Sequence, residues 1–325
     1  MHLCKKIFKA GAVLLGVIVL SVTVIYLYNT VFVESKDPRA SAPASTKFIT
    51  AGSEDLAYRE WDNKATTTVV FVGGLSAWSG TWERVIDAVD QVKGDVNYIA
   101  IDLPPFGYSI PVSNARYFRD VQAERIETFV KAKNIEHVVI VGHSYGAGPA
   151  TEYALRNPDT VKRLVVVDGV LNIDEQKIVN SKGLIQADLI RTILLGTLVH
   201  NDSFAIARFK GFVTVTDAVN QDLLDVYTRY FETKRTTQRL SAWLKDYVND
   251  PLVYKSNTSE NYKTFLPPVR LIWGKKDTIT PVSGAEKMLS ILPNVKLDTL
   301  EGVGHIPMIE NRELFNEALL EALTN

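Results

Sequence analysis

"VIVGHSYGAG", residues 139–148, places one serine between two glycines directly after a run of β-branched residues. The residues that follow, 145–156, have helical composition. A strand, then Gly142-x-Ser144-x-Gly146, then a helix is the arrangement of a nucleophile elbow, whose tight turn holds a serine hydroxyl clear of the sheet. Glycines at both flanking positions let the two backbones pass each other in that turn. We therefore expect Ser144 to be a nucleophile.

The competing interpretation is a glycine-rich turn that binds a nucleotide. A dinucleotide-binding turn has the pattern G-x-G-x-x-G, and a phosphate-binding loop has G-x-x-x-x-G-K-[ST]. Neither pattern occurs in residues 139–148. The nucleophile interpretation is therefore preferred.

A serine hydroxyl is a weak nucleophile without a general base, and histidine is the usual base. The chain has five histidines. His305 follows the last apolar run and precedes a C-terminal helix, so we expect it in a loop at the carboxyl end of a strand. His2 lies before the apolar N-terminal segment, His137 opens a strand at the opposite end of the sheet, and His143 is expected to point away from the serine. His200 lies in a helical interval, where we expect a surface position. His305 is the predicted base.

The base in turn needs an acid that fixes its tautomer and orientation. Asp277, in "LIWGKKDTITP", comes just after one strand, and Asp168, in "VVVDG", ends the preceding strand. Aspartates also occupy strand ends and turns for structural reasons alone. We favour Asp277, because the chain order Ser144, Asp277, His305 is then nucleophile, acid, base. Asp168 is the rival acid.

The anionic intermediate of acyl transfer needs hydrogen-bond donors, each worth about 3–4 kcal/mol of transition-state stabilisation. The first candidate is the backbone N–H of Tyr145, the residue after the serine. The second is the N–H of Leu75, because Gly73-Gly74-Leu75 bends the chain after an apolar strand. We predict an oxyanion hole made by Leu75 and Tyr145.

Short β-branched runs alternate with helical stretches from about residue 47 onward. The runs are continuously apolar, as parallel strands covered on both faces are. The alternation predicts a doubly wound, mostly parallel α/β sheet, whose binding site lies outside the carboxyl ends of its strands. Residues 170–263 contain only helical material, so we expect a helical cap inserted after the sixth strand. The runs assigned to strands are 67–74, 96–104, 137–144, 163–169 and 269–277.

The N-terminal segment 10–33 contains no charged residue and is long enough to cross a bilayer as a helix. Lys5, Lys6 and Lys9 precede it and Glu34 follows it. The positive-inside rule then places the N-terminus in the cytoplasm and the rest of the chain on the non-cytoplasmic side. We expect an uncleaved single-pass transmembrane anchor. The alternative is a cleaved signal peptide and a secreted protein, although a signal peptide has a shorter apolar region.

These patterns divide the chain into an anchor and one interrupted catalytic domain. A stretch rich in Ser, Ala and Pro separates the two and reads as a linker. The expected intervals are 1–9, cytoplasmic N-terminus; 10–33, transmembrane anchor; 34–46, linker; 47–169, first part of the core; 170–263, cap; and 264–325, second part of the core.

Composition narrows the possible functions further. The 325 residues carry a net charge of −1, which gives no electrostatic reason to expect a nucleic-acid partner. The single cysteine, Cys4, excludes an intrachain disulfide framework. A Ser-Asp-His mechanism needs no metal or cofactor, and the sequence contains no obvious metal-ligand cluster. We therefore predict neither.

Five stretches of this chain resemble, in order, the landmarks of the α/β-hydrolase family: "FVGGLSAWSGTW", "IDLPPFGYS", "VGHSYGAGPA", "LIWGKKDTITP" and "GVGHIPMIE". The resemblance covers residues from about 47 to 325 and implies the α/β-hydrolase fold. It also implies a triad of Ser144, Asp277 and His305 and a hole at Leu75 and Tyr145. Ser144 places the chain in the serine branch, because the epoxide hydrolases and haloalkane dehalogenases of the family carry an aspartate nucleophile.

The chain departs from the family at the oxyanion loop. The family usually has His-Gly before the oxyanion residue, and this chain has Gly73-Gly74. An imidazole that would brace the loop is therefore missing.

The anchor and the apolar cap segment "GLIQADLIRTILLGTLV", 183–199, make the chain similar to membrane-anchored monoacylglycerol-lipase-like members of the family. We predict a hydrolase that cleaves a small-molecule carboxylic ester, with a lipid or monoacylglycerol ester as the finer hypothesis, through an acyl-enzyme on Ser144. The alternatives are other chemistry of the same family, namely amide or carbon–carbon hydrolysis, acyl transfer or perhydrolysis. A hydrolase-like protein that only binds a small molecule is a further alternative.

Overall fold

The computed structural model describes residues 2–175 and 183–324. It contains one eight-stranded sheet with the strand order β1-β2-β4-β3-β5-β6-β7-β8. Strand β2 pairs antiparallel with β1 and with β4, and all the other neighbours are parallel. The strands are β1 Lys47–Ala51, β2 Glu54–Trp61, β3 Thr67–Val72, β4 Asn97–Ile101, β5 His137–His143, β6 Val161–Val167, β7 Val269–Gly274 and β8 Val295–Leu300.

The predicted fold class is confirmed: the sheet is mostly parallel and doubly wound. The five apolar runs assigned to strands correspond to β3, β4, β5, β6 and β7. The β1–β2 hairpin was not predicted. Strand β2, "EDLAYREW", mixes charged and apolar residues because it lies near the edge of the sheet, so it lacks the continuous apolar run used to recognise strands.

Helices cover both faces of the sheet, and each face has its own apolar core. Helices α4, α5 and α11 bury residues such as Phe129, Tyr153 and Met288 on one face. Helices α3 and α13 bury residues such as Ile86 and Phe315 on the other. The core helices are α3 Glu83–Asp90, α4 Arg119–Ala132, α5 Ala147–Arg156, α10 Ser259–Lys263, α11 Ser283–Ile291, α12 Pro307–Glu310 and α13 Arg312–Thr324.

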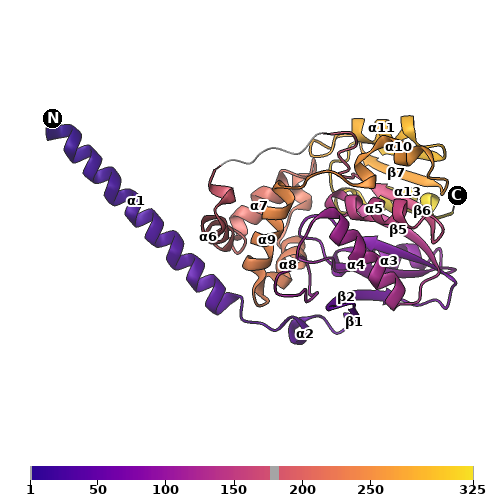
Figure 1. The fold of residues 1–325 in the computed structure, drawn as a ribbon, viewed down its shortest axis with the longest axis horizontal. Helices are drawn as coiled ribbons and strands as arrows, with labels where there is room; N and C mark the ends of the chain where they lie inside the picture. Colours follow the sequence, from indigo (N-terminus) through magenta and orange to yellow (C-terminus); the bar gives the residue numbers. More distant parts are fainter. Residues whose placement is uncertain (1, 176–182, 325) are drawn as a thin grey trace.

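A group of helices between β6 and β7 forms the cap. Its longer members are α6 Asp188–Leu198, α7 Asp202–Lys210, α8 Gln221–Thr228 and α9 Thr236–Val248. They gather to one side of the sheet in Figure 1, where α6, α7, α8 and α9 stand between α1 and the core. A third apolar cluster joins them to the core, because Trp243 and Tyr230 of the cap pack with Trp78 and Phe106. The predicted cap interval 170–263 also contains α10. Its Tyr262 packs in the apolar core on the face of the sheet that α4, α5 and α11 cover.

The N-terminal helix α1, His2–Tyr28, continues into a five-residue π-helix, Asn29–Val33. Figure 1 shows α1 projecting away from the domain on the side of α6. By length and composition, the stretch Ile7–Val33 is able to cross a membrane, and it is the one such stretch among the described residues. Helix α1 is therefore compatible with a membrane anchor or a signal sequence.

The first residue of the interval 34–46, which was expected to be a linker, is packed against the cap. The buried Glu34 carboxylate accepts hydrogen bonds from the Thr237 N–H at 3.0 Å and from the Thr237 hydroxyl. His200 Nε2 lies 3.1 Å from the same carboxylate, and both side chains are less than a tenth exposed. The expected surface position of His200 was therefore wrong, because a partner distant in sequence covers it.

Candidate active site

The turn after β5 has the geometry of a nucleophile elbow. Ser144 has a φ of +50°, a strained conformation for a residue other than glycine. A Cβ on Gly142 would lie 2.7 Å from Ala147 Cα, and one on Gly146 would lie 2.3 Å from the Gly73 carbonyl oxygen. Both distances are shorter than any side chain tolerates. Close backbone approach therefore leaves room only for glycine at positions 142 and 146.

The structure brings together Ser144, Asp277 and His305, which are separated by up to 161 residues. Ser144 Oγ lies 2.8 Å from His305 Nε2, and His305 Nδ1 lies 2.7 Å from Asp277 Oδ2. All three residues are buried. Because a carboxylate only accepts hydrogen bonds, Nδ1 carries the proton and Nε2 is free to accept the serine proton.

Asp277 is held as a carboxylate by its surroundings. Its oxygens accept hydrogen bonds from the Ile279 N–H at 2.7 Å, from the Thr280 N–H at 3.0 Å and from the Thr280 hydroxyl at 2.6 Å. Burial opposes ionisation, but His305 and Thr280 outweigh it and hold the pKa of Asp277 below its usual value. A carboxylate at this position is able to stabilise the imidazolium that a proton on His305 Nε2 would create.

Asp168, the rival acid, occupies a different position. Its Oδ1 accepts a hydrogen bond from the Gly274 N–H at 2.8 Å, and its carbonyl oxygen lies 3.0 Å from the oxygen of the Thr280 hydroxyl. Burial, and then the charge of Asp277, raises the pKa of Asp168 well above its usual value. Asp168 is thus less favoured as a carboxylate than Asp277, and the carboxylate on His305 Nδ1 is that of Asp277.

The predicted oxyanion residues line the same cavity as Ser144 and His305. The loop that follows β3 lies against the elbow, since a Cβ on Gly74 would be only 2.9 Å from Ser144 Cβ. Among the described residues, the Leu75 N–H donates to no protein acceptor and is available to a ligand. Farther along this loop, the Ser79 N–H donates to Asp102 Oδ1 at 2.6 Å, which fixes the loop to the end of β4.

Sequence analysis missed the role of His143. Its ring lies beside the oxyanion loop, with Nδ1 3.0 Å from the position of a Cβ on Gly74. Its Nε2 donates to the carbonyl oxygen of His305 at 2.9 Å. Burial, and then the charge of His305, lowers the pKa of His143 to about 3, so the ring is neutral at ordinary pH. His143 therefore lies between the loop at Gly74 and the backbone of His305.

Glu310 is a second residue that sequence analysis missed. Its Oε1 accepts hydrogen bonds from the N–H groups of Gly304 at 3.1 Å and Ile306 at 3.3 Å, on both sides of His305. Its Oε2 accepts from the N–H and the hydroxyl of Thr214, both at 2.7 Å. One carboxylate thus joins the His305 loop to the cap. The residue stands in the stretch "GVGHIPMIE", but the sequence shows no partner for it.

The cavity above Ser144 has a volume of about 130 Å³. His305 and Leu75 line it from the core, and the cap covers it with aromatic side chains. These are Phe209, Phe212, Tyr227, Trp243 and Tyr247. An apolar cavity with a few convergent polar groups is the usual form of a small-molecule site. It suits an apolar group attached to a reactive carbonyl.

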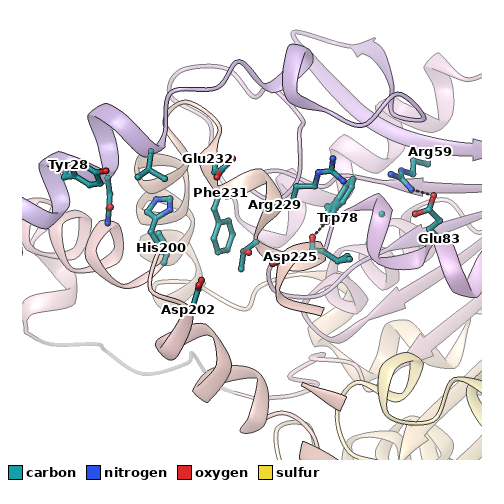
Figure 2. Close-up of a pocket in the computed structure, with 16 residues that line it drawn as sticks. Tyr28, Arg59, Trp78, Glu83, His200, Asp202, Asp225, Arg229, Phe231 and Glu232 are labelled. Carbon is teal, nitrogen blue, oxygen red and sulfur yellow. Dashed lines mark hydrogen bonds and ion pairs between the residues drawn. The ribbon is translucent and has the colours of Figure 1, made fainter. Parts of the chain in front are cut away.

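A larger cavity of about 740 Å³ lies elsewhere, between the end of α1, the cap and β2 (Figure 2). Its lining is charged, with Arg59 and Arg229 near Trp78 and Asp202 near His200 (Figure 2). None of the three residues of the Ser-Asp-His arrangement lines it. The chemistry of Ser144 therefore belongs to the smaller cavity. Among the described residues, no group of three or more His, Cys, Asp and Glu side chains is placed to hold a metal ion.

Comparison with known proteins places this arrangement in a family. Residues 67–312 match the sequence pattern of the alpha/beta hydrolase fold. The match covers most of the chain and includes the elbow, the oxyanion loop and the segments that carry Asp277 and His305. The chain belongs to the alpha/beta hydrolase fold family, and it is an enzyme of the hydrolase class.

The relatives of this chain are named as hydrolases of different kinds. The 2-hydroxy-6-oxononadienedioate/2-hydroxy-6-oxononatrienedioate hydrolase of Cupriavidus pinatubonensis is 24% identical over 86% of this chain and 96% of its own length. The monoacylglycerol lipase abhd6-A of Xenopus laevis is 25% identical over 84% of this chain and 80% of its own. A crystal structure of a membrane phospholipase A has a TM-score of 0.63 at 23% identity, and the likeness covers 98% of both chains. The lipase relatives support ester hydrolysis in general.

Proposed function

We propose that the chain is a serine hydrolase of lipid esters that acts through an acyl-enzyme on Ser144. The observation that carries the proposal is the continuous contact from Ser144 Oγ through His305 to the Asp277 carboxylate, at 2.8 and 2.7 Å, at the floor of an apolar cavity. Lipid esters are favoured over small polar esters because the cap covers the serine with aromatic side chains. The monoacylglycerol lipase among the relatives supports the same substrate class.

In the proposed reaction, Ser144 Oγ attacks the ester carbonyl carbon while His305 Nε2 takes the serine proton. The Asp277 carboxylate stabilises the resulting imidazolium. The N–H groups of Leu75 and Tyr145 donate to the oxyanion of the tetrahedral intermediate. The intermediate expels the alcohol, which takes the proton from His305, and the acyl group remains on Ser144. Water then attacks the acyl-enzyme with His305 again as base, which releases the carboxylic acid and restores the serine.

Hydrolysis of esters with graded acyl chains tests the proposal. The full chain in detergent is assayed with monoacylglycerols and soluble esters from acetyl to palmitoyl, beside the Ser144→Ala variant. We expect kcat/KM to rise with acyl length because each buried methylene contributes about 0.8 kcal/mol, and we expect Ser144→Ala to be inactive. A strong preference for short soluble esters contradicts the lipid proposal. Turnover of 2-hydroxy-6-oxo acids in place of esters would favour the carbon–carbon hydrolysis alternative.

We further propose that α1 is retained as an anchor, with its N-terminus in the cytoplasm and the catalytic domain on the non-cytoplasmic side. The lysines before the apolar segment support this orientation. Retention is supported by the packing of the π-helix that continues α1 on the cap, where Asn29 Nδ2 donates to the Gly196 carbonyl oxygen at 2.7 Å. The intact mass of the protein extracted from membranes checks retention. Loss of the first 30 or so residues would indicate the signal-peptide alternative, since signal peptides have about 15–30 residues.

A further inference from the structure

Helix α6 presents three different faces, and one of them is uncovered. Its polar face packs on α9, where the buried Arg191 guanidinium donates to the Ser241 carbonyl oxygen at 2.9 Å. A second face contacts α1. The third carries Ile190, Leu194 and Leu198, spaced four residues apart, which are 37%, 40% and 37% exposed. Residues at this spacing form one continuous stripe along a helix.

The contact between α6 and α1 determines which part of the anchor lies beside this stripe. A Cβ on Gly196 would lie 2.7 Å from the Tyr26 ring, so the absence of a side chain there lets the two helices meet. The Thr197 hydroxyl, which donates to the Ile193 carbonyl oxygen of its own helix at 2.8 Å, also lies 3.3 Å from the Val22 carbonyl oxygen. Asn29 donates to the Gly196 carbonyl oxygen. The C-terminal end of α6 therefore lies beside residues 22–29 of the anchor segment.

The anchor segment is apolar where it contacts α6. Val24, Ile25, Leu27, Val31 and Phe32 are each between 45% and 68% exposed, on faces that α6 does not cover. The spanning stretch Ile7–Val33 has 27 residues, or about 40 Å of helix, against about 30 Å of hydrocarbon in a bilayer. Its last two turns therefore reach the boundary between acyl chains and headgroups, and any lipid that covers them also reaches α6.

We propose that the exposed stripe of α6 is a membrane-contacting surface, whose partner is the lipid bilayer that surrounds α1. Arg191 is the single charged residue between Leu189 and Val199, and it is buried, so no charge opposes insertion of the stripe. Asp188, at the start of the helix, pairs with Arg191 and with Lys245. An apolar stripe without an exposed charge is the face by which a helix enters the membrane interface.

The surface would bring the cap to the membrane. Helix α7 directly follows α6 in the chain. Phe209 of α7 lines the cavity above Ser144. An inserted α6 would thus hold the roof of that cavity close to the lipid. The proposal itself concerns only the surface and does not depend on the reaction assigned to Ser144.

A single environment-sensitive dye at defined positions tests the proposal. The full chain with Cys4→Ser, which removes the single native cysteine, receives Leu194→Cys, Leu198→Cys or Leu266→Cys and is labelled with a nitrobenzoxadiazole dye. Leu266 is a matched control, because it is 75% exposed and precedes the amino end of β7, whereas the cap covers Ser144 at the carboxyl end of β5. Each protein is reconstituted in phosphatidylcholine liposomes. Quenching by aqueous iodide and by phosphatidylcholine with a nitroxide near its headgroup end is then measured.

Dyes at Leu194 and Leu198 should be quenched by the nitroxide lipid, and their iodide quenching should be about threefold or more weaker than at Leu266, since ions are excluded from apolar surroundings. Iodide quenching equal to that at Leu266, without nitroxide quenching, would overturn the proposal. Protection from both quenchers, with disulfide-linked dimers through the unlabelled Leu194→Cys at high lipid dilution, would also overturn it and assign the stripe to a second copy of the chain. Circular dichroism verifies the fold of each variant.

Discussion

Glu310 offers the sharpest prediction about the link between the cap and the catalytic loop. In Glu310→Ala, the N–H groups of Gly304 and Ile306 lose their acceptor. Both belong to buried residues, and an unsatisfied donor costs about 1–3 kcal/mol. The free energy of unfolding should therefore fall by about 2–6 kcal/mol. In Glu310→Gln the amide oxygen can still accept hydrogen bonds from these two N–H groups. The NH₂ group then faces Thr214, which is exposed, so water can accept the hydrogen bond that the Thr214 N–H loses. That variant should lose only about 1 kcal/mol.

Urea unfolding in detergent, followed by tryptophan fluorescence, measures the stability of both variants. Glu313→Gln is the matched control, because Glu313 is an exposed carboxylate three residues away, with no hydrogen bond or ion pair among the described residues. Its effect should lie within about 0.5 kcal/mol. Ester turnover should follow the same order, with kcat of Glu310→Gln lowered about tenfold, equivalent to about 1.4 kcal/mol. The reasoning is refuted if Glu310→Ala matches Glu313→Gln in both measurements.

Three further predictions concern the triad, the elbow and acid stability. Asp277→Asn should lower kcat about 10⁴-fold in the ester assay, because an amide at that place favours the wrong tautomer of His305; activity within tenfold of the wild type would contradict the assignment. Gly146→Ala should lower the free energy of unfolding by about 3 kcal/mol, since its methyl would meet a backbone oxygen at 2.3 Å. Gly284→Ala, whose methyl meets only ordinary contacts at 3.8 Å, should have little effect. The pKa of His143 is about 3 when folded, against 6.5 when unfolded, so the unfolded chain binds an extra proton between these pH values. Its contribution is complete above pH 6.5 and is lost by about 1.4 kcal/mol per pH unit as pH falls toward 3. In unfolding titrations, His143→Gln should remove this slope; an unchanged slope would assign it to other groups.

The parts of the fold that depend on short-range patterns could be predicted from the sequence. Strand β5 and the elbow were recognisable because a buried parallel strand is continuously apolar and because G-x-S-x-G has few other uses. The β1–β2 hairpin lacks such a pattern. Its residues mix polar and apolar side chains, as suits strands near an exposed edge. Their pairing is apparent only in the assembled sheet.

The same distinction between local patterns and long-range contacts applies to the candidate site. Ser144, Asp277 and His305 could be selected because their chemistry limits the choice to a few residues at strand ends. The contacts that support them could not, since each joins segments distant in the chain. His143 reaches the carbonyl of a residue 162 positions away, and Glu310 reaches a cap segment 96 positions away. No local pattern encodes either contact.

The packing of the anchor on the cap was likewise invisible in the sequence. Residues 34–46 have the composition of a flexible linker, and composition alone predicts a flexible connection. Glu34 nevertheless finds Thr237 and His200 in the cap, more than 160 residues away. A single buried carboxylate with such partners is enough to turn a connection into a packed junction.

The central claim, that Ser144 is an activated nucleophile, is tested most directly by covalent labelling with a fluorophosphonate probe. The wild type, Ser144→Ala and His305→Ala are treated in parallel, after circular dichroism shows that each is folded. If the claim holds, the wild type is labelled and peptide mass spectrometry places the adduct on Ser144, whereas both variants remain unlabelled. An unlabelled but folded wild type, or a Ser144→Ala protein that is labelled as fast as the wild type, would contradict it.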